Sequence, residues 1–384
     1  MAIEAVDPRA RGLRTRSAGN DAVGILGAAR RLDWVLLGAT AAAVAYGVWT
    51  IGGITRHDVG GSAASRQALY AGAGAVLLVV ALLIDPAVYR RFWRAIYIAL
   101  CGMMTIVLVM GAATRGSKRW IDIGFFTFQP SEFGKVLVAL TLAGYLADHG
   151  KEVGRLSVAL RTIVLAAGPV LLVFLQPDAG TALVYVSVLA AVLFVSGMRW
   201  LHLALVGGIG LIVILGVLWW LPAAGVQVLK PYQTQRLSNS NSYNLTQSKI
   251  AIGAGNFHGR GVAGATQTAL DYLPAHATDF AFASLAEQRG FLGASVLLLL
   301  YLLVVWRGLK IVTRARDLYC AIVAAGIVFA LLVQIFVNVG MTMGIAPITG
   351  IPLPFTSVGG SAMISNLAAI GVLLSIHARG RRRA

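Results

Sequence analysis

The stretch "LYCAIVAAGIVFALLVQIFVNVGMTM", Leu318 to Met343, carries no charged residue over its whole length. A helix needs about 20 mainly apolar residues to cross the hydrocarbon core of a bilayer. It also satisfies every backbone N–H and C=O group within its own segment, which lipid cannot do. The stretch therefore predicts a helix that spans a membrane.

The rest of the chain repeats this pattern. Hydrophobic residues make up 58% of the 384 residues and charged residues only 12%, which is too apolar for a soluble domain with an ordinary surface. We predict an all-α polytopic membrane protein whose ten transmembrane helices form one bundle over 32–377. The ten predicted spans are 32–54, 67–84, 95–113, 132–147, 160–176, 180–197, 201–221, 280–306, 318–343 and 358–377.

Two tails and one long loop lie outside these spans. Residues 1–31, rich in Arg, Ala and Gly, predict a disordered basic tail in the cytoplasm, and 378–384 predict a short basic tail on the same side. Residues 222–279 form a long extracytoplasmic loop between predicted helices 7 and 8. A loop of that length usually carries a function or is disordered.

The net charge of +17 could indicate a nucleic-acid partner, but its distribution argues against one. With the N-terminus inside and the chain alternating sides at each span, most Lys and Arg residues fall on the inner side, as the positive-inside rule requires. Examples are Arg30, Arg31, Arg90, Arg91, Arg307 and Arg316. The basic residues therefore indicate membrane topology, with both termini in the cytoplasm and contacts to anionic lipid.

The long loop contains G-x-G-x-x-G at Gly259, Gly261 and Gly264. No predicted strand precedes it and no βαβ unit surrounds it, so a flexible turn is favoured over a dinucleotide site. A weaker alternative is that successive backbone N–H groups cradle a phosphate. Cys101 and Cys320 lie inside predicted spans as packing thiols, and the histidines show no metal-ligand spacing, so we predict no metal site.

Four charged residues gather where predicted spans meet the outer face. Glu132 and Lys135 begin the fourth span on one helical face, which suits either a local ion pair or a binding role. Asp178 lies in the turn between spans five and six, where a helix N-cap is the simpler interpretation. Asp279 stands between the polar loop and span eight. Because a charge at a span edge costs free energy, each of the four is a candidate functional residue.

Asp279 is the strongest candidate. It could cap span eight, with Thr278 beside it, but a carboxylate between a polar loop and an apolar wall is also partly desolvated. Desolvation would raise its pKa toward that of a general base. Glu287 and Arg289, farther along span eight, predict either a polar interior or an internal ion pair. The chain is therefore expected to enclose an outward-facing polar cavity beneath the long loop.

The segment ahead of the tenth span, "GIAPITGIPLPFTSVGGSAMISNL", is dense in Gly, Pro and Ser. This composition predicts irregular backbone at membrane depth. Such backbone is tolerated only where protein covers it or where it lines a cavity.

Four motifs in order resemble the SEDS family (shape, elongation, division and sporulation proteins), the peptidoglycan polymerases that include RodA and FtsW. The resemblance runs over about 31–377, and "QPDAGT" with "NVGM" makes it closer to the rod-elongation branch, RodA, than to the division branch, FtsW. The motifs are "RWIDIGFFTFQPSEFGK", "QPDAGTA", "LPAHATDFAFASLAEQRGFLG" and "TGIPLPFTSVGGSAM".

The resemblance implies a glycosyltransferase of the bacterial cytoplasmic (inner) membrane that polymerises lipid II, the undecaprenyl-pyrophosphoryl disaccharide-pentapeptide. The family's essential aspartate maps onto Asp279, which would act as general base in a displacement that inverts the anomeric carbon. Lys135 is the first candidate for the cation that stabilises the leaving pyrophosphate. The other residues that the resemblance or the loop's charge assigns to substrate binding are Glu132, Asp178, Arg236, Lys249, Thr278 and Ser357.

The resemblance also implies partners: a class B penicillin-binding protein transpeptidase and other membrane proteins of the elongation complex. No cofactor is certain, although a divalent cation, Mg or Mn, could bridge carboxylates and pyrophosphate. The sequence departs from the family at Ala275, His276 and Val358, which puts any catalytic role of His276 in doubt. A lipid II flippase and a non-catalytic scaffold of the wall-synthesis complex stay open as alternatives.

Overall fold

The computed structural model describes residues 31–56, 63–114, 117–122, 124, 127–215 and 243–380. Residues 1–30 and 381–384 of the two predicted tails, and the first part of the long loop, including Arg236, lie outside the described residues. The predicted boundary of the second tail at residue 378 is slightly early, because the last helix ends at Ala378 and Arg379 donates to Leu82 O and Leu83 O.

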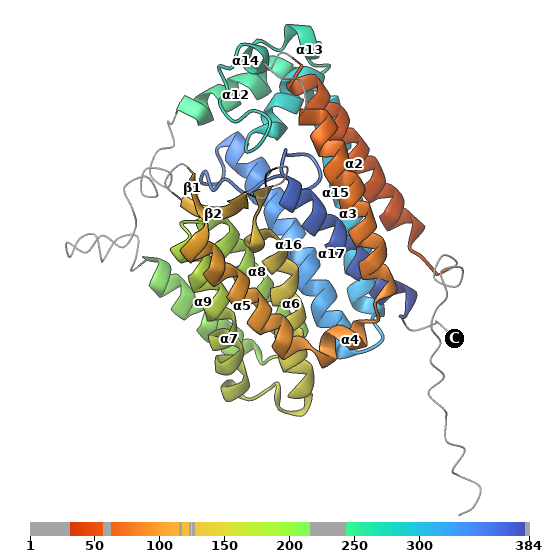
Figure 1. Cartoon of the computed structure of the whole chain (residues 1–384), viewed down its shortest axis with the longest axis vertical. Helices are drawn as coiled ribbons and strands as arrows, with labels where there is room; N and C mark the ends of the chain where they lie inside the picture. Colours follow the sequence, from red (N-terminus) through yellow and green to blue (C-terminus); the bar gives the residue numbers. More distant parts are fainter. Residues whose placement is uncertain are drawn as a thin grey trace, which may run out of the picture.

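Ten described helices occupy the positions of the ten predicted spans and form one bundle (Figure 1). Seven of them are long and apolar enough to cross a membrane, and α6, α8 and α9 complete the set. The prediction of an all-α polytopic membrane protein is confirmed. The helices are α2 (Trp34–Ile54), α3 (Ala63–Leu83), α5 (Trp93–Met110), α6 (Pro130–Asp148), α7 (Leu156–Leu175), α8 (Ala179–Val195), α9 (Trp200–Leu215), α15 (Ala281–Arg314), α16 (Leu318–Met343) and α17 (Gly360–Ala378).

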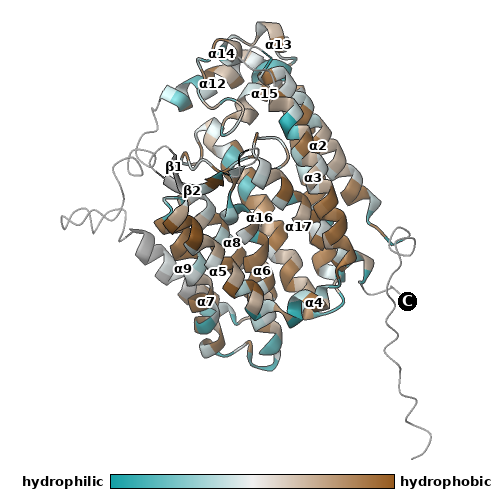
Figure 2. Ribbon diagram, viewed as in Figure 1, coloured by the Kyte–Doolittle hydropathy of each residue, from teal (hydrophilic) through white to brown (hydrophobic). Residues whose placement is uncertain are grey.

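The bundle has apolar helices along its length and polar residues at its two ends (Figure 2). We call these ends by the elements they carry. The α12 end has α12 (Tyr243–Gly255), α13 (Gly261–Gly264) and α14 (Thr266–Ala269), and the α4 end has α4 (Pro86–Arg91). Large hydrophobic side chains such as Leu69, Ile98 and Val164 are exposed on the helix surfaces, as expected where lipid is the solvent.

Small residues let the helices approach closely, as is usual in membrane bundles. Gly74 of α3 lies under the Leu367 side chain of α17, and Gly371 of α17 faces the backbone of Leu78. In the centre, α6 and α16 are buried over most of their length and pack against each other and against α8.

The segment after α5 differs from the prediction, which extended the third span to residue 113. The helix ends at Met110, and the chain then forms an antiparallel sheet of three short strands, β1 (Ala112–Thr114), β2 (Ser117–Asp122) and β3 (Thr127–Phe128). The carboxylate of Asp122 accepts a hydrogen bond from Gly124 N, which closes the turn between β2 and β3. These strands carry the chain directly into α6.

The eighth span also differs from the single helix expected over 280–306. Within α15, Gly290 has φ 65° and ψ −165°, so the element consists of a short helix and a longer one joined at a break. The N–H groups freed at the break are not lost: Phe291 N donates to Asn256 O and Leu292 N donates to Phe257 O. The long loop and the broken helix therefore complete each other's hydrogen bonds.

Glycines make this contact possible. Gly255 lies against the backbone of Ala286, and Gly259, with φ 85°, lies against the backbone of Gln288 and Arg289. A side chain at either position would collide with the backbone of α15. Of the three glycines in the G-x-G-x-x-G sequence, Gly259 thus has a packing role against α15.

Candidate active site

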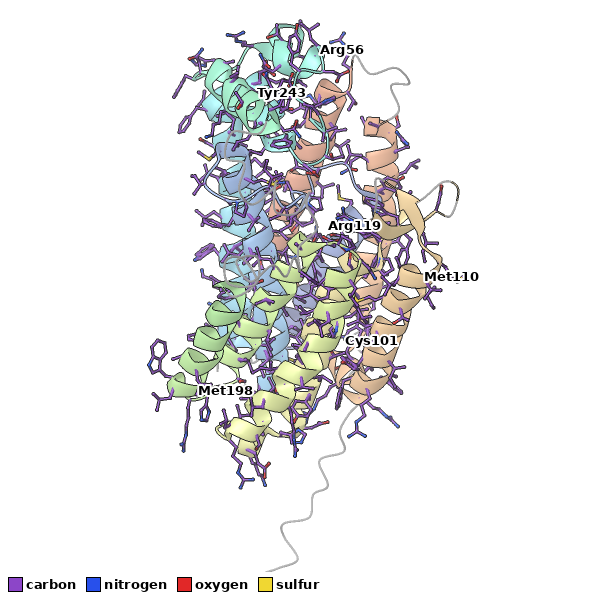
Figure 3. All side chains as sticks on the ribbon, turned by 90° about the vertical axis from the view of Figure 1, so that its left-hand side faces the viewer. Arg56, Cys101, Met110, Arg119, Met198 and Tyr243 are labelled. Atoms are coloured by element: carbon purple, nitrogen blue, oxygen red, sulfur yellow. The ribbon has the colours of Figure 1, made fainter. Side chains whose placement is uncertain are left out.

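A polar cavity of about 370 Å³ lies between the small sheet, the turn before α15 and the Gly- and Pro-rich segment before α17. Asp279 and Thr278 line it on one side, and Arg119 and Trp120 of β2 line it on another. Arg119 sits high on the bundle, below the level of Tyr243 (Figure 3). The lining residues are Arg119, Trp120, Thr127, Gln129, Thr278, Asp279, Gly350, Pro352, Val358, Gly359, Gly360, Ser361 and Ala362.

Asp279 is presented by a tight turn. Ala275 takes a left-handed conformation with φ 56°, and its carbonyl accepts hydrogen bonds from both Thr278 N and Phe280 N. The N-cap residue of α15 is Phe280, which makes no side-chain cap hydrogen bond. Asp279 therefore lies one residue before the N-cap position.

The backbone of this turn is held from two other elements. Ser357 Oγ donates to Thr278 O, and Val358 N donates to Ala277 O. From α16, the buried Asn338 amide donates to both Asp279 O (3.1 Å) and Ile351 O (2.8 Å). Catalysis requires a reacting group to be positioned precisely, and a backbone held by packed helices can position the Asp279 carboxylate in this way.

The segment that carries Ser357 is irregular, as its composition predicted, and protein covers it. Gln67 of α3 donates from Nε2 to Ser357 O at 2.9 Å, and its Oε1 accepts from Gly359 N. Phe355 has φ 64°, and its carbonyl lies against Gly47 of α2, where no side chain would fit. Contacts from α2, α3 and α16 thus hold the segment around Ser357 in place, and this segment in turn holds the turn that carries Asp279.

The opposite wall of the cavity joins Arg119 to Asp178. The Arg119 guanidinium forms an ion pair with Asp178 (3.5 Å), while Gln129 Nε2 donates to the other carboxylate oxygen at 3.1 Å. Trp120 Nε1 in turn donates to Gln129 Oε1 at 3.1 Å. Asp178 also caps α8 by accepting from Thr181 N, so its predicted N-cap role is confirmed alongside its link to the cavity.

Glu132 and Lys135 form the predicted local ion pair, with 2.6 Å between Nζ and Oε2. Both side chains are almost completely buried in the bundle and do not line the polar cavity. Lys135 instead borders a small space of about 10 Å³ beside Gln334 and Asn366.

The remaining predicted residues lie elsewhere. Lys249 on α12 is exposed, and its side chain lies against Gly344, the residue that ends α16. Glu287 does not pair with Arg289: its carboxylate accepts hydrogen bonds from Gln267 N, Thr268 N and Thr268 Oγ1. Arg289 stacks over the Trp49 ring of α2.

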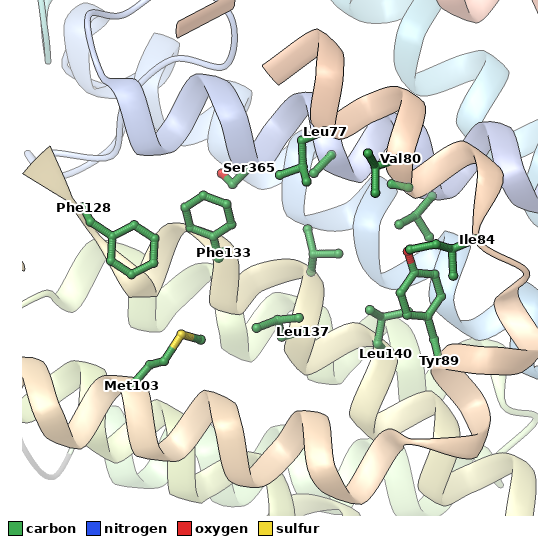
Figure 4. A pocket seen from close by; sticks show the side chains of 14 residues that line it. Leu77, Val80, Ile84, Tyr89, Met103, Phe128, Phe133, Leu137, Leu140 and Ser365 are labelled. Carbon is green, nitrogen blue, oxygen red and sulfur yellow. The ribbon is translucent and has the colours of Figure 1, made fainter. Parts of the chain in front are cut away.

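An apolar groove of about 330 Å³ runs beside the polar cavity between α3, α5, α6 and α17 (Figure 4). Phe128 of β3 and Phe133 lie at one end of it and Tyr89 at the other. Phe128 is the neighbour of Thr127 and Gln129 in the polar cavity, so β3 separates the two spaces. The pair can accept a molecule with a polar head and a long apolar chain.

Sequence reasoning missed Arg119, Gln129, Asn338 and Gln67. The aromatic and β-branched residues of "RWIDI" could have indicated a short strand that includes Arg119. For Asn338 and Gln67, a neutral amide inside an apolar span was the available signal.

Comparison with known proteins now adds to this geometry. A family model for cell cycle proteins, named for FtsW, RodA and SpoVE, matches residues 30–382. The chain belongs to this family. The resemblance seen in the four motifs is thereby confirmed.

Among its relatives is the peptidoglycan glycosyltransferase MrdB of Escherichia coli (strain K12), 36% identical over 355 residues that cover 90% of this chain and 93% of MrdB. Stage V sporulation protein E of Bacillus subtilis (strain 168) is 34% identical over 329 residues, which cover 82% of this chain and 86% of the sporulation protein. Among solved structures, a chain of a peptidoglycan synthase complex of polymerization and crosslinking has a TM-score of 0.77 at 30% identity, covering 90% of this chain and 97% of that one. The crystal structure of Thermus thermophilus RodA has a TM-score of 0.66 at 26% identity, covering 90% of this chain and 96% of that one.

Proposed function

We propose that this protein is a peptidoglycan glycosyltransferase that polymerises lipid II into glycan strands during cell elongation, with Asp279 as its general base. The observation that carries the proposal is the position of Asp279. It lines a polar cavity, Asn338 donates to its carbonyl, and Ser357 donates to the carbonyl of the preceding residue, Thr278. The names of the relatives support the same reaction class.

The two adjoining spaces suit the two parts of a lipid-linked sugar. The disaccharide and pyrophosphate would occupy the polar cavity, and the prenyl chain would lie in the apolar groove beyond Phe128. A chain of this kind reaches the site from within the bilayer, because the groove lies between membrane helices.

The chemistry is a displacement at an anomeric carbon. Asp279 takes the proton of the attacking hydroxyl, the new glycosidic bond forms, and the bond from the anomeric carbon to the pyrophosphate oxygen breaks. The leaving pyrophosphate keeps the electron pair and needs a cation. Because Arg119 lines the same cavity, we place it ahead of Lys135, Lys249 and Arg236 in this role.

The α12 end is proposed to face outward and the basic α4 end to face the cytoplasm of a bacterial inner membrane, with both termini inside. A class B penicillin-binding protein is the proposed partner, and lipid II is the proposed substrate. The similarity to a chain from a complex that couples polymerization and crosslinking supports such a partner.

The test is polymerisation of labelled lipid II by purified protein. Asp279→Asn should lower the rate by about 10²–10⁴-fold, the usual contribution of a general base, without changing thermal stability. The matched control is Asp271→Asn, because Asp271 lies in the same loop with its side chain 76% exposed. Equal polymer from wild type and Asp279→Asn would remove the proposed base and favour a flippase or scaffold.

The divalent cation is tested in the same assay. Among the described residues, no three His, Cys, Asp or Glu side chains are grouped so that they could hold a metal ion. We propose that the carboxylates of Asp279 or Asp178 would hold any Mg or Mn ion, which would supply positive charge to the leaving pyrophosphate. Chelation with EDTA should then slow polymerisation, and adding back Mg or Mn should restore it.

A further inference from the structure

The α4 end carries a bent connection between α3 and α5. Asp85 caps α4 by accepting from Ala87 N at 2.8 Å, and Phe92 joins α4 to α5. The Val88 side chain is 45% exposed and that of Phe92 is 53% exposed. Apolar side chains at this level place the α4–α5 bend at the membrane surface, where an exposed apolar group meets lipid and a charged group meets headgroups.

Beside the bend lies a hollow of about 470 Å³ in which three guanidinium groups face one carboxylate. We call it the arginine hollow. It is lined by Ala87, Arg90, Arg91, Trp93, Arg94 and Asp148.

The single carboxylate is already engaged. Asp148 accepts from Trp93 Nε1 at 2.9 Å and pairs with Arg90 at 3.5 Å, and Arg90 also donates to Ala147 O. The other two arginines stack on rings: Arg91 over Phe92 and Arg94 over Trp93. Within the described part of the chain, no carboxylate lies within 4 Å of either. The N–H groups of Arg91 and Arg94 can therefore donate hydrogen bonds to another anion.

We propose that the arginine hollow binds the phosphate of an anionic phospholipid in the leaflet at the α4 end. A stacked guanidinium offers two parallel N–H groups to a phosphate, a geometry that a lysine cannot provide. Tryptophans such as Trp93 are common at the level of the lipid headgroups. With the α4 end facing the cytoplasm, as proposed above, the leaflet at this end is the one rich in anionic lipid. The acyl chains would lie along the exposed face of α5, where Ile98 is 70% exposed.

The experiment uses the full-length protein in a mild detergent and measures thermal unfolding and bound lipid by native mass spectrometry. The probes are phosphatidylglycerol, phosphatidylcholine and soluble glycerol 3-phosphate. The test variant is Arg91→Gln with Arg94→Gln. The control is Arg161→Gln, which removes an exposed positive charge on α7 outside the hollow.

Phosphatidylglycerol should bind the wild type and the Arg161→Gln control with equal affinity. It should bind the double variant at least about tenfold more weakly, because each basic residue at a membrane surface usually contributes to the affinity for anionic lipid. Phosphatidylcholine should bind all three equally weakly. Undiminished phosphatidylglycerol binding by the double variant overturns the site. Equal stabilisation by glycerol 3-phosphate overturns the lipid as the ligand. Neither readout depends on polymerisation.

Discussion

At the scale of single residues, the position of Asp279 depends on neutral amides. Asn338 donates to Asp279 O and Ile351 O at once, so Asn338→Ala would remove this donor from both carbonyls. A buried polar group left unsatisfied costs about 1–3 kcal/mol. We expect Asn338→Ala to lower thermal stability by that amount and to reduce the turnover number more than it changes KM, because Asp279 would lose its fixed position.

The control for this prediction is Asn366→Ala. Asn366 is equally buried in the bundle, but its amide nitrogen has no hydrogen-bond partner in the described structure. Unfolding and lipid II turnover are measured for both variants. Normal turnover in Asn338→Ala would show that Asp279 keeps its place without this amide.

The residues of the site differ in how readily the sequence alone identifies them as functional. Asp279, Asp178 and Lys135 could be singled out because a charge beside an apolar run is costly and therefore needs a reason. Asn338 and Gln67 give only the weaker signal of a neutral amide inside an apolar span, and it does not identify their partners, which are backbone groups of segments far away in the chain. Arg119 lies in a polar segment, where a basic residue needs no special explanation.

At the scale of elements, the break in α15 depends on one glycine. Gly290 has a positive φ, and a Cβ there would meet Gly259 N and the backbone of Phe257 and His258. We expect Gly290→Ala to separate α12 from α15, with a loss of at least about 1 kcal/mol from the backbone conformation alone and more from the collision. Thermal unfolding and limited proteolysis of the loop around α12 would detect the change.

Gly72→Ala on α3 is the matched control, because no atom lies within 4 Å of a Cβ placed there. Alanine in an open helical position should be neutral or stabilise the helix by up to about 1 kcal/mol. Protection of the loop from protease in Gly290→Ala equal to that in wild type would mean that the break in α15 does not require glycine at this position.

The elements that the sequence did not predict share a cause. Hydropathy identifies ten spans because each is long and apolar, but it gives nearly the same value whether Gly290 bends the chain or continues a helix. The strands β1 and β3 are too short for an alternating pattern to be recognised.

At the scale of the whole molecule, an ion pair joins α15 to the N-cap residue of α2. Arg307 donates from Nε and Nη2 to Asp33 Oδ2, at 2.9 and 2.6 Å, and the Asp33 side chain is 1% exposed. Removing one partner of a buried pair leaves a charge unpaired, which typically costs about 3–5 kcal/mol. We therefore expect Arg307→Ala to lower the unfolding free energy by about 3 kcal/mol.

A double-mutant cycle separates this pair from other effects of the arginine. Asp33→Asn combined with Arg307→Ala removes both charges, and the asparagine can still cap α2, so the double variant should be more stable than Arg307→Ala alone. Additive losses in the cycle would show that the two side chains do not stabilise each other.

The apolar groove beside β3 has a kinetic consequence for the proposed polymerase. A substrate that enters the groove from the bilayer, between α3 and α5, diffuses in two dimensions. The concentration that sets the rate is therefore the number of lipid II molecules per unit area of bilayer. Diluting lipid II with inert phospholipid at constant total substrate should slow the enzyme, whereas diluting whole vesicles with buffer should leave the turnover of each molecule unchanged.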